Sequence, residues 1–305
     1  MRYGGQSSHH RAFRSWPPGH LVEFFPPKTE DQALQILSTA NALARSFQPD
    51  FVSITYGAGG STRERTLKYG RFLKEEYDWQ VMPHLTCVGS SCEELAEILS
   101  GFHTAGFRNI MALRGDPPKG QTDFQPHPDG LRYGNELVAF IRERFDSFCL
   151  GVAGYPETHP QAPSPDLDIA NLKRKVEAGA SFVTTQMFFE NDRYVDFVER
   201  ARAAGITVPI MPGLMPLSSI KPGQTDFFGA QLPEVLRERL ARAETPETQA
   251  KIGADWCYAQ LIDLLERGAP GVHLYIMNRS QAALMIMERL KRDHPEWAGP
   301  RMAIA

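Results

Sequence analysis

Short apolar segments alternate with longer amphipathic segments along most of the chain. The short segments are rich in β-branched and aromatic residues, which is typical of strands, and the longer ones repeat their apolar positions with the period of a helix. We expect strands at residues 20–24, 51–55, 80–86, 109–114, 148–154, 181–186, 207–213 and 271–276. Helices are expected at residues 30–47, 91–105, 135–145, 169–178, 193–204 and 279–291, and another is expected to begin at Ser61.

The spacing of these segments predicts the architecture. Strands that alternate with helices pair in parallel, and about eight such units in roughly 250 residues have the size of a (β/α)8 barrel. We therefore predict an α/β fold, a single (β/α)8 TIM barrel over residues 20–300, preceded by a flexible tail over residues 1–19. The long interval before the last strand has room for two extra helices, separated near residues 243–246. An open doubly wound sheet is the competing architecture, although no GxGxxG motif follows the first strand.

Composition and charge narrow the class of function. The chain has 305 residues, 42% of them hydrophobic, and a formal net charge of −3. Nucleic-acid binders usually carry a basic excess, so we expect no nucleic-acid partner. No stretch reaches the roughly 18 apolar residues of a membrane helix, and the N-terminus lacks the apolar run of a signal peptide. We expect a cytoplasmic enzyme with its four cysteines reduced, and a homo-oligomer on general grounds.

Polar residues mark the end of almost every expected strand. In a (β/α)8 barrel the carboxyl ends of the strands build the active site. The residues at these ends are Glu23, Thr55, Tyr56, His84, Thr86, Arg114, Asp116, Tyr155, Gln186 and Tyr275. Their placement at one rim predicts a site there.

Single motifs in this set allow two interpretations each. Glu23 has apolar neighbours on both sides. It is either an exposed carboxylate or a desolvated carboxyl whose raised pKa suits it to donate a proton. Arg114 and Asp116 belong either to a turn or to a rim site that binds an anion. Asn171, Arg174 and Lys175 share a helix face, and spacing alone favours a solvated face over a phosphate site.

Several common kinds of site lack their residues here. No lysine lies in the C-terminal half of an expected strand, which argues against a Schiff-base aldolase. Cys87 and Cys92 have no second pair of ligands, and no strand end clusters histidines with carboxylates, so we expect no metal site. The remaining aromatic, Arg, Asp, Gln and Glu residues suit a planar organic cofactor and a planar substrate.

Nine motifs carry a family resemblance. They are VEFFPPKT, VSITYGAGGSTRERT, PHLTC, ALRGDPP, AGYPETHP, NLKRKVEAGA, TTQMFF, PIMPGLMP and YIMNRS. Together, in this order over about residues 20–290, they closely resemble bacterial methylenetetrahydrofolate reductase. The resemblance implies a (β/α)8 barrel that binds FAD and reduces 5,10-methylenetetrahydrofolate to 5-methyltetrahydrofolate with NADH or NADPH, in one-carbon metabolism and methionine supply. It also implies the bacterial form, without the regulatory domain of eukaryotic relatives.

The resemblance further implies roles for single residues. Glu23 would be the general acid that opens the methylene bridge, and Asp116 would tune the flavin and hydrogen-bond the pterin. Gln186 would bind the pterin, and Arg279, with Tyr275 near it, would bind the folate. Flavin contacts would come from Thr55, Tyr56, Ala58, His84, Arg114, Gly115, Asp116, Gly134, Tyr155, His159, Ala162, Asp168, Asn171, Arg174 and Lys175, which reverses the solvated-face interpretation of the last three.

One position departs from the family pattern, and two other functions stay open. Where several members carry a folate-contacting glutamine, this chain has Pro222, with Gln224 two residues later. A flavin-free pterin-binding barrel that transfers a one-carbon group is one alternative, and a non-catalytic folate- or flavin-binding barrel is the other. The sequence has no ribose-reading motif that distinguishes NADH from NADPH.

Overall fold

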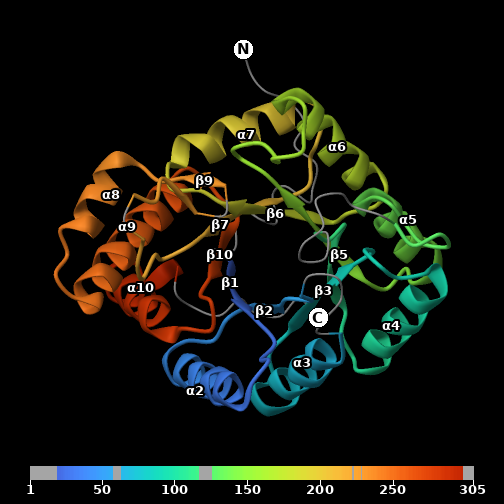
Figure 1. Ribbon diagram of the computed structural model, residues 1–305, viewed down its shortest axis with the longest axis horizontal. Helices are drawn as coiled ribbons and strands as arrows, with labels where there is room; N and C mark the ends of the chain where they lie inside the picture. Colours follow the sequence, from blue (N-terminus) through green and yellow to red (C-terminus); the bar gives the residue numbers. More distant parts are fainter. Residues whose placement is uncertain (1–18, 58–62, 117–125, 222, 228, 298–305) are drawn as a thin grey trace.

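Eight parallel strands close into a barrel in the computed structural model of the chain (Figure 1). The structure describes residues 19–57, 63–116, 126–221, 223–227 and 229–297. The barrel strands are β1 (Gly19–Phe24), β2 (Phe51–Ile54), β3 (Val81–Thr86), β4 (Asn109–Leu113), β5 (Cys149–Gly154), β6 (Phe182–Met187), β7 (Ile210–Leu214) and β10 (Gly271–Tyr275). Because β1 pairs with both β2 and β10, the ring is closed. The predicted barrel is confirmed, and the open sheet is wrong.

Helices form a ring around the outside of the barrel (Figure 1). They are α2 (Glu30–Ser46), α3 (Arg63–Tyr77), α4 (Cys92–Thr104), α5 (Gly134–Arg144), α6 (Pro165–Glu177), α7 (Asn191–Ala203), α8 (Glu234–Ala241), α9 (Pro246–Glu266) and α10 (Ser280–Asp293). The helices α8 and α9 both lie between β7 and β10, which confirms the two extra helices expected before the last strand. No helix in the described ranges combines the length and the apolar character that crossing a membrane requires.

Some boundaries differ from the sequence-based prediction for local reasons. The helix α6 begins four residues earlier than its apolar period indicates, because the Ser164 side chain caps it and Pro165 fits its first turn. The strand β7 begins at Ile210 rather than at residue 207. Gly19, placed in the expected tail, begins β1. Ser61 and residues 1–18 lie outside the described residues.

A short antiparallel hairpin follows β7 and was not predicted. Its strands are β8 (Asp226–Phe227) and β9 (Ala230–Gln231), each too short to show a period in the sequence. Beneath it lies a second apolar cluster, separate from the main core, formed by Met187, Phe189, Met215, Leu217, Ala230, Leu232, Leu236 and Leu240. Tyr275 packs against this cluster. Through Ala230, the hairpin therefore shares an apolar cluster with residues at the carboxyl ends of β6 and β7, where the site is expected.

Candidate active site

The barrel brings most of the predicted polar residues to its carboxyl end. Three of them directly follow a strand: Thr55 after β2, Arg114 after β4 and Tyr155 after β5. Others lie in the last residues of their strands, namely His84 in β3, Gln186 in β6 and Tyr275 in β10. Ala58 and Pro222 lie outside the described residues. The described residues form three groups, which we call the acid cluster, the charged rim and the substrate-side pocket.

The acid cluster consists of Glu23, Ser53, His84 and His273. Glu23 is only 4% exposed. Its Oε2 accepts a hydrogen bond from Ser53 Oγ at 3.4 Å, and lies 3.3 Å from His84 Nε2 and 3.8 Å from His273 Nε2. Ser53 Oγ also lies 3.2 Å from His273 Nε2. The four residues come from β1, β2, β3 and β10, which are consecutive around the closed barrel.

Burial decides the charge state of this cluster. It raises the pKa of Glu23 from 4.5 to about 8, while the hydrogen bond from Ser53 opposes the shift. It lowers the pKa of His84 to about 4 and that of His273 to about 3. Both imidazoles are therefore neutral at pH 7 and provide no positive charge to stabilise a carboxylate. The cluster holds Glu23 as a protonated acid at neutral pH.

Sequence reasoning missed Ser53 and His273, because only strand ends were considered. The alternation of side-chain direction along each strand could have identified both residues. Ser53 lies two residues before Thr55, and His273 two residues before Tyr275. Side chains two residues apart in a strand point to the same face, so both residues share the inward face of a strand whose end had been chosen.

The charged rim consists of Arg114, Asp116, Asp168 and Lys175. The charges of these residues act on two aromatic side chains, Tyr155 and His159, on the loop that follows β5. The Tyr155 and His159 rings meet edge to face, with centroids 4.6 Å apart. The backbone N–H of His159 donates to Asp168 Oδ2 at 3.0 Å, and the N–H of Ala162 donates to the His159 carbonyl. Burial raises the pKa of Tyr155 to about 12, and the charges of Asp116, Asp168 and Arg114 also act on it. The structure thus brings these predicted residues together.

Lys175 points inward from α6 at this rim, and its neighbours on the helix do not. Its Nζ donates to the Ala153 carbonyl of β5. Burial lowers the pKa of Lys175 to about 8, and the charge of Asp168 opposes the shift. Within the described ranges Lys175 makes no ion pair with a carboxylate. Arg174 and Asn171 are exposed, and Arg174 Nη1 donates to Asn171 Oδ1.

Two glycines shape the rim. A Cβ on Gly134, the first residue of α5, would lie 3.6 Å from Arg114 N and 3.7 Å from Lys175 Cδ, so the start of α5 converges with both residues. Gly115 has a φ of +90°, and a Cβ there would lie only 2.6 Å from Val88 Cγ1. Any other residue at position 115 would displace this turn, which carries Asp116 to the exposed edge of the rim.

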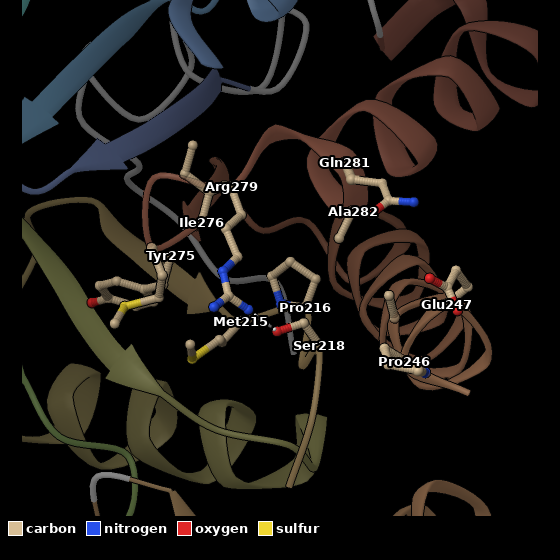
Figure 2. Close-up of a pocket in the computed structure, with 12 residues that line it drawn as sticks. Met215, Pro216, Ser218, Pro246, Glu247, Tyr275, Ile276, Arg279, Gln281 and Ala282 are labelled. Carbon is tan, nitrogen blue, oxygen red and sulfur yellow. Dashed lines mark hydrogen bonds between the residues drawn. The ribbon is translucent and has the colours of Figure 1, made fainter. Parts of the chain in front are cut away.

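The substrate-side pocket opens between the ends of β7 and β10 (Figure 2). Met215, Pro216, Tyr275 and Arg279 contribute to its lining, and its volume is 180 Å³. Figure 2 shows the Arg279 side chain extending toward Ser218, to whose Oγ its Nη1 donates at 3.0 Å. No carboxylate in the described part of the chain forms an ion pair with Arg279. The pocket therefore combines an apolar wall with two charged side chains, Arg279 and Glu247, which form no ion pair with each other.

Tyr275 connects the three groups. Its hydroxyl donates to the Thr185 carbonyl at 2.8 Å. Burial raises its pKa well above 10, and the charges of Glu23 and Tyr155 raise it further. Because Tyr275 lines the pocket and is also the β10 partner of Glu23 in the strand ladder, the pocket lies next to the acid cluster.

Two glutamines are engaged in local hydrogen bonds. Gln186 Oε1 accepts from Met187 N at 3.0 Å. Gln224 Oε1 accepts from Lys221 N, and its Nε2 donates to the Asp226 carbonyl. In this structure Gln224 thus holds the turn before the hairpin. The described residues contain no group of three or more His, Cys, Asp or Glu side chains arranged to hold a metal ion.

Comparisons with known proteins agree on one family. The family model for methylenetetrahydrofolate reductase matches residues 18–291. The chain is 36% identical to the 5,10-methylenetetrahydrofolate reductase of Pectobacterium carotovorum, over 88% of each chain. It is 37% identical to methylenetetrahydrofolate reductase 1 of Schizosaccharomyces pombe, over 89% of this chain but 45% of that longer protein.

A solved structure agrees in fold alone. An uncharacterized protein from Clostridium thermocellum, described as binding two copies of 5-methyl-5,6,7,8-tetrahydrofolic acid, superposes with a TM-score of 0.61 at 14% identity. The match covers 93% of this chain and 99% of that one.

Proposed function

We propose that this chain, which belongs to the methylenetetrahydrofolate reductase family, reduces 5,10-methylenetetrahydrofolate to 5-methyltetrahydrofolate with NADH or NADPH and a bound FAD. The observation that carries the proposal is the acid cluster, in which the buried Glu23 carboxyl keeps its proton at neutral pH. Opening the methylene bridge of the substrate requires a proton on the departing nitrogen. A protonated carboxyl beside the pocket supplies it by general acid catalysis.

The neighbours of Glu23 have separate tasks in this proposal. Ser53 holds one carboxyl oxygen through its hydroxyl, which fixes the direction of the acid. His84 and His273 stay neutral and therefore do not pull the proton off Glu23 before the substrate arrives. Once the proton has left, the Ser53 hydroxyl remains as a hydrogen-bond donor to the new carboxylate.

The donor set of the charged rim fits FAD. A diphosphate binds best to cationic side chains and to the free N–H groups of a helix start. The backbone at Arg114, the Lys175 side chain and the first turn of α5 converge at the rim, and Arg174 lies exposed one residue before Lys175. The Tyr155 and His159 rings offer apolar surface to a planar ring system. When bound, FAD supplies the exchange of hydride between nicotinamide and folate.

The pocket suits one part of the folate, because its volume of about 180 Å³ is smaller than the whole molecule. Arg279 is a cation without a described carboxylate partner, so it suits the carboxylate end of a folate. Gln186 and Asp116 carry the polar groups that we assign to the pterin ring. The apolar wall of the pocket, which includes Met215 and Tyr275, suits the aromatic middle of the molecule.

Colour tests this function directly. We expect purified protein, or protein reconstituted with FAD, to be yellow and to be bleached by NADH or NADPH without oxygen. Methylenetetrahydrofolate should then restore the colour and yield an equal amount of 5-methyltetrahydrofolate. A colourless protein that flavin cannot reconstitute would support a flavin-free one-carbon transferase. A yellow protein that neither nucleotide bleaches would support a non-catalytic binding barrel.

A further inference from the structure

The loop between β10 and α10 has an unusual backbone at two consecutive positions. Met277 and Asn278 have φ values of +51° and +58°, in the left-handed region that most residues with a side chain avoid. Asn tolerates this region better than most residues. Asn278 is only 7% exposed although it is polar. A buried polar residue in this conformation needs a reason in its contacts.

Those contacts join the segment that follows the first strand of the barrel to the segment that follows the last strand. Asn278 Oδ1 accepts a hydrogen bond from Phe25 N at 2.8 Å, and Asn278 Nδ2 donates to the Phe25 carbonyl at 2.8 Å. The Asn278 carbonyl accepts from Thr39 Oγ1 of α2, also at 2.8 Å. We call this set of three bonds the Asn278 clamp.

The clamp continues the strand pairing beyond the strands themselves. The ladder between β1 and β10 ends at the pair Glu23 and Tyr275. Phe25 follows Glu23 by two residues, and Asn278 follows Tyr275 by three. The Asn278 carboxamide thus makes the two hydrogen bonds that a paired backbone would make, at a point where both segments have already left the sheet. It fixes the start of one loop against the start of the other.

We propose that Asn278 is a positioning residue that sets the distance between the proton donor Glu23 and the substrate-binding cation Arg279. Arg279 directly follows Asn278, and its backbone N–H donates to the Ile276 carbonyl, which closes the same turn. This proposal rests on the proposed function, because a folate that contacts both residues is aligned only when their two loops keep a fixed spacing. Asn278 acts through Glu23 and Arg279 and needs no contact with the substrate.

Two substitutions test the clamp. Asn278→Gly keeps the left-handed backbone without strain and removes the carboxamide. Asn278→Asp keeps the size and the acceptor for Phe25 N, but sets a second oxygen against the Phe25 carbonyl. In both variants we expect bleaching by NADH or NADPH to stay within about twofold of the parent protein. Reoxidation by methylenetetrahydrofolate should slow roughly tenfold or more, since small misplacements of reacting groups cost rates of this order.

The pH profile of the folate half-reaction distinguishes a role of Asn278 in positioning Glu23 from a purely structural role. If the loop that begins at Phe25 moves out, water reaches the Glu23 carboxyl at the end of β1, so the apparent pKa of the folate half-reaction should fall from about 8 toward 4.5. Tyr194→Phe is the matched control. It removes another buried bond, from Tyr194 Oη to the Ile210 carbonyl at 2.7 Å, at the opposite end of the barrel where β7 begins. This control should lower the melting temperature without changing the ratio of the half-reactions or the pH profile.

The outcomes distinguish this proposal from the proposed function. If the parent protein is never reoxidised by methylenetetrahydrofolate, the proposed function fails, and the role of Asn278 fails with it. If the parent completes both half-reactions and the Asn278 variants match it, or slow both halves equally, only the clamp is overturned. Failure of both variants to fold would also overturn it, because Asn278 would then be a structural residue.

Discussion

Replacing Glu23 with Gln tests the acid cluster at its centre. Gln has nearly the same shape as Glu but carries no carboxyl proton. We expect the variant to fold, to retain FAD and to be bleached by NADH or NADPH at a near-normal rate, since that step needs no acid. Its reoxidation by methylenetetrahydrofolate should fall by at least the roughly 10²-fold typical of losing a general acid.

The pKa of Glu23 sets the pH dependence of the parent protein. With a pKa of about 8, roughly nine-tenths of the carboxyl is protonated at pH 7 and about one-tenth at pH 9. The folate half-reaction should therefore slow roughly tenfold between pH 7 and pH 9. Bleaching by the nicotinamide should lack this break. The residual folate half-reaction of Glu23→Gln should lack it as well.

Stability gives a measure that does not depend on turnover. The folded state holds the Glu23 proton more tightly than the unfolded state, so the free energy of unfolding falls as pH rises from 4.5 to about 8. The slope is at most about 1.4 kcal/mol per pH unit, or about 5 kcal/mol over the range. Glu23→Gln lacks this loss. Both proteins contain His84 and His273, so the difference between their unfolding curves isolates Glu23.

Urea unfolding at several pH values measures that difference, and stopped-flow absorbance follows each half-reaction. The reasoning is refuted if Glu23→Gln slows both half-reactions equally, because Glu23 would then position the flavin or support the fold. It is also refuted if neither half-reaction slows. A stability difference that stays constant from pH 5 to pH 8 would show that Glu23 is already ionised in the folded protein.

Three further substitutions test the charged rim. Asp116→Asn removes a negative charge that disfavours the reduced anionic flavin, so the reduction potential of the flavin should rise while folate turnover slows. An anaerobic redox titration measures the potential, and an unshifted or lowered value contradicts the electrostatic argument. Arg174→Ala should weaken FAD retention by about 1.5–3 kcal/mol, the range for a charge-assisted contact, as measured by fluorescence titration. The control is Arg71→Ala, which removes an exposed helix arginine paired with Glu75 and should not change FAD retention. Gly115→Ala should destabilise the protein by more than Gly89→Ala, as measured by chemical denaturation. Both glycines have a positive φ, but only position 115 lacks room for a Cβ. Equal losses of unfolding free energy would mean that the turn at Gly115 accepts a Cβ without extra cost.

Most of the fold follows from local patterns in the sequence. Each strand carries its own apolar run and each helix its own period, so the alternation and the barrel are readable without tertiary contacts. The start of α6 was misplaced because Ser164 and Pro165 act through capping rather than through apolar spacing. The β8–β9 hairpin was missed because two-residue strands have no period, and their pairing depends on the apolar cluster beneath them.

The site was predictable only in part. The residues that were missed contact partners that lie far away along the chain. Residues at strand ends share a rim whichever strands are neighbours, so Glu23, Arg114 and Tyr155 were found. A closed barrel implies that its first and last strands are neighbours, but the sequence does not give their register, and this register brings His273 and Asn278 beside the Glu23 segment. Nothing local to Glu23 indicates that its neighbours include two histidines.

The same adjacency explains why the acid remains neutral. A carboxyl beside a histidine usually transfers its proton and forms an ion pair, because the histidine ordinarily has the higher pKa. Here burial reverses the order, since it raises the pKa of Glu23 to about 8 and lowers those of His84 and His273 to about 4 and 3. Closure of the barrel excludes water from all three groups at once. A substitution that lets water reach them should therefore ionise Glu23 before any contact with the substrate is lost.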